Sequence, residues 1–431
     1  MKKDLALDLI DFLYKSPTAY HSVKTIKERL DLNGFTEVKE SDKWNLEKEG
    51  KYYIIKNDSA LIAFNIGTGD IEEEGFKLIG AHTDSPGFRV KANPEIVSEG
   101  TYLKLNTEVY GGPILHTWFD RPLGIAGKIT LKGNSPLKPE VKLVNINKPI
   151  LIIPSLAIHM NRSVNDGFNI NAQKDTLPLL SLIKDKFEKD GFLVKTIAEE
   201  LKINSEDILG FDLGLYEIEK GSIIGLNEEF ISSGRLDDMW MVYAGIQALI
   251  NSKSNKATKV MVCIDNEEIG SLTPQGANSA LLLNILERIT LALGKDREGI
   301  HRALANSLMI SADLAHAVHP NIPEKHDPTN RPVLGKGPVL KTAASGSYST
   351  DSYNTAIFEG LCRAAEVPYQ KFFNKSDVRG GTTIGPITSS LLTIPVMDMG
   401  APLLSMHSIR ELASVVDNEY TIRLFTEFYN I

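Results

Sequence analysis

Apolar residues recur every three or four positions from Leu5 to about Leu32. The spacing breaks at Ser16-Pro17 and stops at Gly34, residues that commonly interrupt or end helices. The pattern predicts two helices at the start of the chain. The next apolar runs, at residues 52–56 and 60–66, are separated by turn-forming residues, and a further run covers 76–81. These runs predict a β-hairpin followed by a strand.

Between residues 92 and 232 the pattern changes to short alternating runs, with Gly and Pro between them. We expect strands at 102–109, 125–131 and 141–153 and few helices, which is typical of a β-rich domain. Strands and helices alternate again after that segment. We expect helices at 237–250, 275–293 and 350–365, and strands at 259–265, 308–312 and 394–398.

This alternation predicts an α/β fold, with a mixed, largely parallel sheet covered by helices. The main domain is expected to consist of residues 1–91 and 233–431, and the β-rich segment at 92–232 to be an insert. The length of 431 residues agrees with more than one structural unit, because a single core seldom organises so long a chain.

Composition excludes several classes of protein. With 47 Lys+Arg against 55 Asp+Glu, the net charge of -8 argues against nucleic acid or an anionic membrane as partner. The apolar stretches at 149–160 and 277–294 are too short or too charged to span a bilayer. Two cysteines, Cys263 and Cys362, cannot form a disulfide framework, and they favour a reducing compartment. We therefore expect a cytoplasmic protein without a membrane partner.

Polar residues follow the ends of four predicted strands, and another carboxylate begins a predicted helix. Open α/β sheets bind ligands outside the carboxyl ends of their strands, so we expect these side chains to converge. They are His82, Asp84, Glu267, Glu268, Asp313 and His407, with Asp237 at the helix start.

Imidazoles and carboxylates without a thiolate suit Zn²⁺, Mn²⁺ or Co²⁺, and a bridging carboxylate would allow two ions to share the set. Asp84 is in reach of the second ring nitrogen of His82, where it would fix the tautomer. In the Glu267-Glu268 pair, one carboxylate could bind metal while the other acts as a base for water. Taken singly, these residues also fit surface turns and helix caps, but their shared sheet edge favours a metal site.

Seven strings of the chain, in order, resemble the aspartyl aminopeptidases and vacuolar aminopeptidase I, a family of co-catalytic zinc exopeptidases. They are Gly-Ala-His-Thr-Asp-Ser-Pro (80–86), Ser-Gly-Arg-Leu-Asp-Asp (233–238), Asp-Asn-Glu-Glu-Ile-Gly-Ser (265–271), Ser-Ala-Asp-Leu-Ala-His-Ala-Val-His-Pro-Asn (311–321), Lys-Gly-Pro-Val-Leu-Lys (336–341), Gly-Gly-Thr-Thr-Ile-Gly-Pro (380–386) and Met-His-Ser-Ile-Arg-Glu (406–411). The resemblance implies a zinc exopeptidase-like fold and a metalloaminopeptidase that uses two Zn²⁺ per subunit, with Mn²⁺ or Co²⁺ as possible substitutes.

The resemblance also implies a role for each of these side chains. His82 and Asp313 would hold one zinc, Glu268 and His407 the other, and Asp237 would bridge them. Asp84 would orient the His82 ring, and Glu267 would be the general base.

For assembly, the resemblance implies that the insert mediates dimer formation and that dimers build a tetrahedral dodecamer. His159 matches a histidine that a neighbouring subunit presents to the active site, whereas its apolar surroundings alone would indicate a buried histidine.

The resemblance implies peptide substrates with a free N-terminus. Lys341 matches a lysine that reaches the side chain of the residue being removed, which would favour Asp or Glu, although a lysine at a strand end is also typical of a surface position. Gly381, Thr382 and Thr383 would lie along the substrate or form a tight turn, and His316 would line the pocket or cap a loop.

Three alternatives remain beside an acid-selective aminopeptidase. One is an aminopeptidase that favours neutral or apolar N-termini. Another is a related two-metal deacylase or carboxypeptidase, and the third is an oligomeric scaffold that has lost its chemistry.

Overall fold

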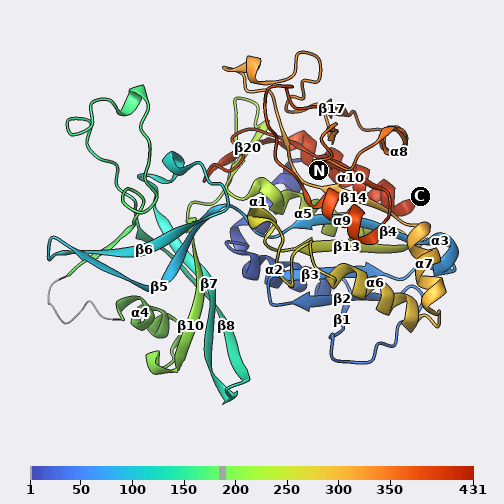
Figure 1. Ribbon diagram of the computed structural model, residues 1–431, viewed down its shortest axis with the longest axis horizontal. Helices are drawn as coiled ribbons and strands as arrows, with labels where there is room; N and C mark the ends of the chain where they lie inside the picture. Colours follow the sequence, from blue (N-terminus) through green and yellow to red (C-terminus); the bar gives the residue numbers. More distant parts are fainter. Residues whose placement is uncertain (1, 184–190) are drawn as a thin grey trace. The chain divides into compact units, whose positions relative to one another are not determined.

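The computed structural model describes residues 2–183 and 191–431, and its chain divides into two compact units (Figure 1). The first unit consists of Met1–Asp84, Gly221–Met406 and Glu411–Ile431, and the second of Ser85–Lys220 with His407–Arg410. Residue 1 of the predicted main domain and residues 184–190 of the predicted insert lie outside the described residues.

A nine-stranded sheet organises the first unit, in the order β1-β2-β3-β13-β4-β14-β18-β16-β17. The central strands β13, β4, β14 and β18 run parallel, whereas β3 and β16 run antiparallel to the central strands beside them. The strands are β1 (Thr36–Glu37), β2 (Lys51–Lys56), β3 (Ala60–Asn65), β4 (Phe76–His82), β13 (Thr258–Ile264), β14 (Leu308–Ala312), β16 (Val339–Lys341), β17 (Gln370–Phe372) and β18 (Val396–Gly400). The prediction of a mixed, largely parallel sheet is confirmed.

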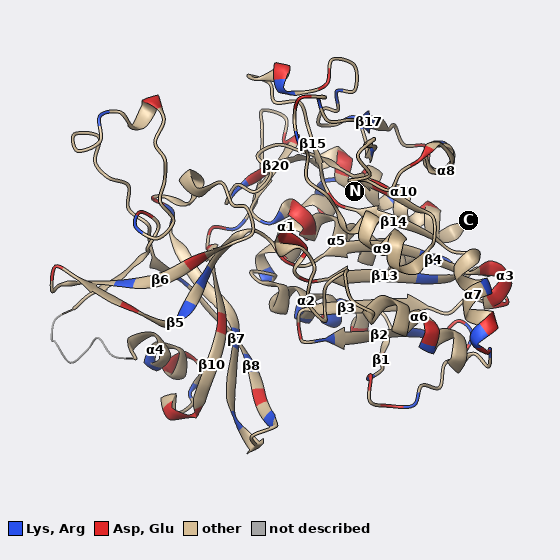
Figure 2. Cartoon of the chain, viewed as in Figure 1, with Lys and Arg blue, Asp and Glu red and all other residues tan. Residues whose placement is uncertain are grey.

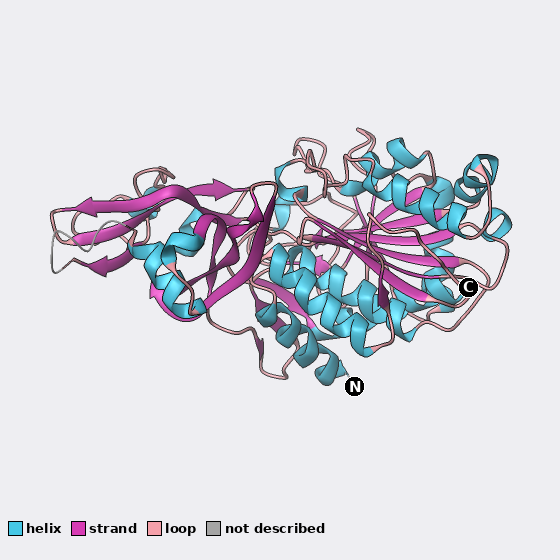
Figure 3. Cartoon of the chain, turned by 90° about the horizontal axis from the view of Figure 1, so that it is seen from below, coloured by secondary structure: helices cyan, strands magenta, loops and turns pink. Residues whose placement is uncertain are grey.

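Helices cover both faces of this sheet, as Figure 3 shows. One face packs against α1 (Lys2–Lys15), α2 (Ala19–Leu32), α5 (Leu236–Asn251), α8 (Ser352–Ala364) and α10 (Val415–Asn430). The other packs against α6 (Leu281–Ala292), α7 (Arg297–Ala305) and α9 (Ile384–Leu392), with the short α3 (Ile71–Glu74) beside them. Adjacent β4 residues such as Leu78 and Ile79 enter opposite cores, which explains why the central strands read as unbroken apolar runs.

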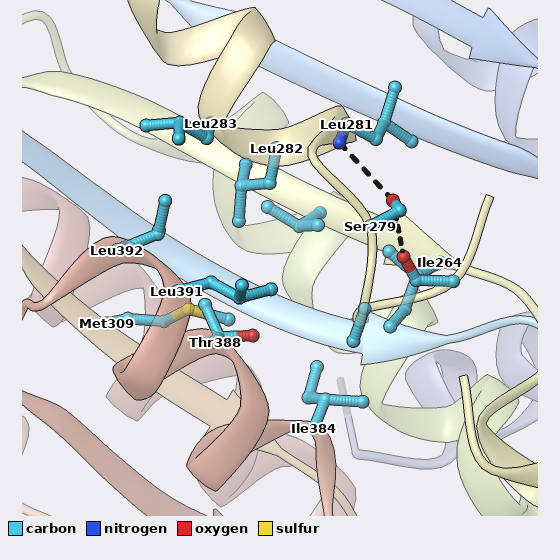
Figure 4. A pocket seen from close by; sticks show the side chains of 13 residues that line it. Ile264, Ser279, Leu281, Leu282, Leu283, Met309, Ile384, Thr388, Leu391 and Leu392 are labelled. Atoms are coloured by element: carbon cyan, nitrogen blue, oxygen red, sulfur yellow. Dashed lines mark hydrogen bonds between the residues drawn. The ribbon is translucent and has the colours of Figure 1, made fainter. Parts of the chain in front are cut away.

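A pocket between α6 and α9 lies within the second of these cores (Figure 4). Its lining side chains are apolar apart from Ser279 and Thr388. Its lining contains no imidazole, carboxylate or thiol for acid-base or metal chemistry.

Two small sheets complete the first unit. One contains β11 (Ser222–Ile224), β12 (Phe230–Ser233) and β20 (Glu411–Ser414), and the other β15 (Ala315–His316) and β19 (Pro402–Leu403). The predicted helix at 275–293 begins only at Leu281. The residues before it fold back on the strand end, where the Gln275 carbonyl accepts a hydrogen bond from the Asp265 amide (3.1 Å).

The second unit is built on a six-stranded antiparallel sheet, in the order β8-β7-β10-β5-β6-β9. Its elements are β5 (Gly87–Ser98), β6 (Tyr102–Tyr110), β7 (Leu123–Ser135), β8 (Lys138–Leu151), β9 (Leu179–Leu182), β10 (Ile208–Glu217) and α4 (Phe192–Leu201). Helix α4 places Leu193 and Ile197 in the core of this unit.

The bounds of the second unit differ from the predicted insert at 92–232. It begins earlier, at Ser85, because β5 pairs with β6 and β10. It ends earlier, at Lys220, because β11 and β12 pair with β20 of the first unit. In the described part of the chain, no helix is both long and apolar enough to cross a membrane.

Candidate metal centre

The carboxyl ends of the adjacent strands β13, β4 and β14 bring chemically active side chains together. His82 ends β4, Glu267 and Glu268 follow β13, and Asp313 follows β14. Asp237 joins them from the start of α5. Ligand atoms of two groups lie within 4.8 Å of one another: His82, Asp237, Asp238 and Asp313, and His82, Glu267 and Glu268.

Asp84 supports this cluster from within the first unit. Its Oδ1 lies 3.3 Å from Nδ1 of His82, and its carboxylate accepts hydrogen bonds from the backbone amides of Glu267 and Glu268, both at 3.2 Å. The other imidazole nitrogen, Nε2, lies 3.6 Å from Oδ1 of Asp237. Buried Asp84 therefore holds the His82 ring through both its backbone carbonyl, 3.1 Å from Nδ1, and its carboxylate, and the same carboxylate holds the turn that carries the two glutamates.

Two carboxylates of the centre were not assigned from the sequence, although both lie within the strings quoted above. Asp238 is completely buried and accepts a hydrogen bond from the His82 amide (3.1 Å) through Oδ2. Its Oδ1 is also buried and has no hydrogen-bond partner among the described residues. Glu411, from β20, accepts a hydrogen bond from the Asp237 amide (3.0 Å). The sequence offers a signal for each residue: Asp238 directly follows the predicted ligand Asp237, and Glu411 ends the last of the seven strings.

Burial and an excess of negative charge shift the pKa values of carboxyl groups in the centre. Burial raises the pKa of Asp238 well above its usual range, His82 lowers it, and the nearby Asp313 and Asp237 raise it further. The pKa of Asp313 is also raised, first by burial, although the charge of Lys341 opposes that effect.

The pKa of Glu267 is raised to about 7, first by burial and then by neighbouring carboxylates, against the lowering effect of His82. Perturbed carboxyl groups of this kind gather at functional sites. The donor set fits a divalent cation, because it joins an imidazole to carboxylates within 4.8 Å and two positive charges would offset their mutual repulsion.

Lys341 is buried at the end of β16, so its interpretation as a surface lysine was wrong. Its Nζ lies 3.4 Å from Oδ2 of Asp313 and donates a hydrogen bond to the Leu314 carbonyl (3.2 Å). Burial alone would lower the pKa of Lys341, but the charge of Asp313 and those of further acidic groups, Asp238 among them, together outweigh burial, and the pKa is raised. The positive charge of Lys341 therefore acts directly on a carboxylate of the centre, that of Asp313.

Comparison with known proteins identifies the family. Residues 12–429 match the family described as "Aminopeptidase I zinc metalloprotease (M18)". The chain belongs to the M18 aminopeptidase family. A "Probable M18 family aminopeptidase 2" of Clostridium novyi (strain NT) is 60% identical over 430 residues, covering 100% of this chain and 99% of the relative.

Solved structures agree with this family assignment. The structure described as "Cryo-EM structure of the Ape4 and Nbr1 complex" is 35% identical, with a TM-score of 0.95, and the match covers 99% of this chain and 86% of that chain. "Structure of S. cerevesiae mApe1 dodecamer" is 31% identical, with a TM-score of 0.86 and coverage of 99% and 96%. The chain is thus an M18 metalloaminopeptidase, and the deacylase, carboxypeptidase and scaffold alternatives do not fit its family.

The Gly381–Thr383 segment of this M18 aminopeptidase leads directly into α9 and is not a tight turn. Thr383 is the N-cap, and its hydroxyl donates a hydrogen bond to Oδ1 of Asp398 (2.6 Å). The Thr382 hydroxyl donates to the Ser347 carbonyl (3.3 Å), whereas Gly381 is exposed. The segment is therefore anchored at its carboxyl side.

His316 of this M18 aminopeptidase is exposed on β15 rather than in a loop. Its ring packs edge-on against Phe372, with the ring centres 6.0 Å apart. This contact places the ring beside β17, and the role of His316 in the substrate pocket stays a prediction.

Two further predicted site residues of the M18 aminopeptidase, His407 and His159, belong to the second unit. Nδ1 of His407 lies 3.0 Å from the Gly112 carbonyl. His159 is exposed after β8, so the interpretation as a buried histidine was wrong. The position of both residues relative to the ligands of the first unit stays a prediction.

Proposed function

We propose that this M18 aminopeptidase removes the N-terminal residue of peptides by two-zinc hydrolysis and favours Asp or Glu at that position. The observation that carries the proposal is the group of His82, Asp237 and Asp313, whose ligand atoms lie within 4.8 Å of one another. Buried acidic side chains around an imidazole have little structural reason to gather at a sheet edge without a cation to bind.

In this proposal His82 and Asp313 hold one zinc, Asp237 bridges, and Glu268 and His407 hold the other. When bound, the two ions would polarise the scissile carbonyl and stabilise negative charge on its oxygen. Mn²⁺ or Co²⁺ would substitute, because both accept the same nitrogen and oxygen ligands.

Glu267 would take a proton from the attacking water and return it to the leaving amine. The contacts of Asp84 support this arrangement, because they hold the Glu267 backbone and the His82 ring at once. Asp84 thus acts through its neighbours, because it holds the proposed base Glu267 and the proposed ligand His82 in fixed positions relative to each other.

The proposed acidic preference depends on Lys341, a buried cation 3.4 Å from Asp313. A carboxylate side chain of the substrate beside this ammonium group would gain a charge-assisted hydrogen bond in a dry site. Asp313 already engages the same charge, and that observation favours the second candidate, an aminopeptidase for neutral or apolar N-termini.

A kinetic panel tests the function. Peptides that begin with Asp, Glu, Leu or Lys are assayed after chelation and again with Zn²⁺, Mn²⁺ or Co²⁺, with an N-acetylated peptide as control. We expect metal to restore activity, the fastest cleavage on Asp or Glu, and no cleavage of the blocked peptide. Fastest cleavage of the Leu peptide would support the second candidate, and cleavage of the N-acetylated peptide would reject both.

Substitution of the lysine tests its role in selectivity. Lys341→Ala should lower the ratio of kcat/KM for Asp over Leu by more than it lowers kcat/KM for Leu. Lys336→Ala, at an exposed lysine before the same strand, is the matched control and should change neither value. Equal losses on the two substrates would reject Lys341 as the selector.

We also propose that the chain forms a tetrahedral dodecamer built from dimers through its second unit, and that it works in the cytoplasm. Support comes from a similar solved structure described as a dodecamer and from the exposure of His159, which suits contact with a neighbouring subunit. The buried free thiols of Cys263 and Cys362 agree with a reducing compartment. Light scattering should give about twelve times the 47.5 kDa chain mass.

A further inference from the structure

We infer that Glu217 and Arg410 are positioning residues that fix the His407 imidazole on the β-rich second unit, so that this unit orients a zinc ligand. The inference rests on the proposed function, in which His407 is a ligand. All the contacts that carry it lie within the second unit, to which His407–Arg410 belongs.

Backbone groups of the segment after β6 hold His407 itself. Its Nδ1 lies 3.0 Å from the Gly112 carbonyl, and its own carbonyl accepts a hydrogen bond from the Ile114 amide (2.9 Å). Because a carbonyl can only accept, the first contact requires the proton on Nδ1, which leaves the lone pair on Nε2. A ligand histidine that donates its other N–H to a carbonyl has its tautomer and ring orientation set for metal.

His407 adopts a left-handed backbone conformation, with a φ of 65°. A residue with a side chain adopts this conformation at a cost unless its surroundings hold it there. The residues that follow His407 keep it in this conformation. Ile409 is buried in the core of the second unit, and its amide donates a hydrogen bond to Oγ1 of Thr117 (3.1 Å).

Arg410 connects the end of the His407–Arg410 segment to β10 through side-chain hydrogen bonds. Its Nε donates to Oε2 of Glu217 (2.9 Å), and its Nη2 donates to the Glu219 carbonyl (2.9 Å). Nη1 of Arg121 donates to the other oxygen, Oε1, of Glu217 (3.0 Å). The Glu217 side chain is 2% exposed and that of Arg410 14%, so the pair is held in a largely dry environment.

A buried carboxylate held by two guanidinium groups is a rigid anchor, because removing its charge leaves the arginines without their partner. Only Ser408 and Ile409 separate Arg410 from His407, which has the left-handed backbone conformation. Without the anchor, the backbone at His407 would be less ordered. Ordering the imidazole on binding metal would then reduce the free energy gained from binding. The expected result is weaker zinc binding rather than loss of the ligand.

The test measures zinc binding by the full chain, with Zn²⁺ as the only probe. Glu217→Gln should weaken one of the two zinc equivalents about 10- to 100-fold, the effect typical of groups that orient a ligand histidine. Glu219→Gln is the matched control, because the Glu219 carboxylate also faces the Arg410 guanidinium, at 3.8 Å, but is 68% exposed and so interacts weakly. This variant should change zinc affinity less than about twofold. Thermal unfolding of the metal-free chains checks that each variant folds.

A double-mutant cycle separates this inference from the proposed function. In the His407→Ala background, Glu217→Gln should weaken zinc binding no further, since there is no ring left to position. If His407→Ala leaves both zinc affinities unchanged, the proposed ligand set is wrong and the inference falls with it. If His407→Ala weakens one site and Glu217→Gln does not, the positioning role alone is overturned. Should Glu217→Gln fail to fold, Arg410→Lys replaces it in the same cycle.

Discussion

Two clusters of charged residues in the first unit use similar side chains for different ends. In the helix cluster, formed by Asp8, Arg29 and Tyr243, the Asp8 carboxylate accepts two hydrogen bonds from Arg29, both at 2.8 Å, and another from the Tyr243 hydroxyl (2.9 Å). Burial alone would raise the pKa of Asp8, but the hydrogen bonds and charge of Arg29 outweigh it and the pKa is lowered.

The metal centre shows the opposite balance, since the pKa values of Asp238 and Asp313 are raised. Figure 2 shows basic and acidic residues distributed along the whole of the described chain. A carboxylate that finds its cation within the fold contributes to stability, whereas an excess of buried carboxylates favours binding of a cation. The two clusters should therefore respond in opposite ways to substitution and to metal.

The largest expected effect is on catalysis. Glu267→Gln should lower kcat by about 10²- to 10⁴-fold while zinc content stays normal, because it removes a proton acceptor without removing a proposed ligand. Steady-state kinetics with metal analysis measure both quantities. Asp8→Asn, from the helix cluster, should leave kcat unchanged. A Glu267→Gln chain that loses zinc would show that Glu267 and Glu268 have exchanged roles.

The next effect concerns stabilisation by metal. Zinc at 100 times its dissociation constant should raise the free energy of unfolding by about 2.7 kcal/mol for each site, through mass action. Asp237→Asn should lose most of this increment and Asp8→Asn should keep it. Denaturant unfolding with and without zinc measures the increment. An unchanged increment in Asp237→Asn would remove Asp237 from the ligand set.

The helix cluster should affect stability alone. Asp8→Asn should lower the free energy of unfolding by about 1 kcal/mol, which is below the usual value for a hydrogen bond to a charged group because 43% of the Asp8 side chain is exposed to solvent. Asp11→Asn removes an exposed pair with Lys15 on the same helix and should cost less than about 0.5 kcal/mol. Equal costs would mean that Arg29 and Tyr243 add nothing beyond a surface ion pair.

The smallest effect is the pH dependence of the difference in free energy of unfolding between wild type and Asp8→Asn. The folded-state pKa of Asp8 is lowered, so its stabilisation is fully present above the unfolded-state pKa of about 3.9 and is lost as pH falls through the folded value. Wild type and Asp8→Asn should therefore differ most near neutral pH and converge below about pH 4. Denaturant unfolding across this range checks the sign, and a difference that grows toward acid would contradict it.

The accuracy of the sequence predictions followed the strength of the local pattern. The central strands β4, β13 and β14 were predicted almost residue for residue, because burial on both faces leaves an unbroken apolar run. Strand β5 was missed, since Gly87–Ser98 has an irregular register with β6 and reads as a loop. The final helix, Val415–Asn430, also received no prediction, although it packs in the first core.

By itself, the sequence determined the family, the α/β class and the chemical type of the site, because these depend on residue identity and on periodicity along the chain. Only the tertiary structure decided that β4 lies between β13 and β14, which brings His82 to Asp313 and Glu267. It also decided that Lys341 is buried and that His407 is held by the β-rich unit. Strand order and burial depend on pairing between distant segments, and no local pattern records which segments pair.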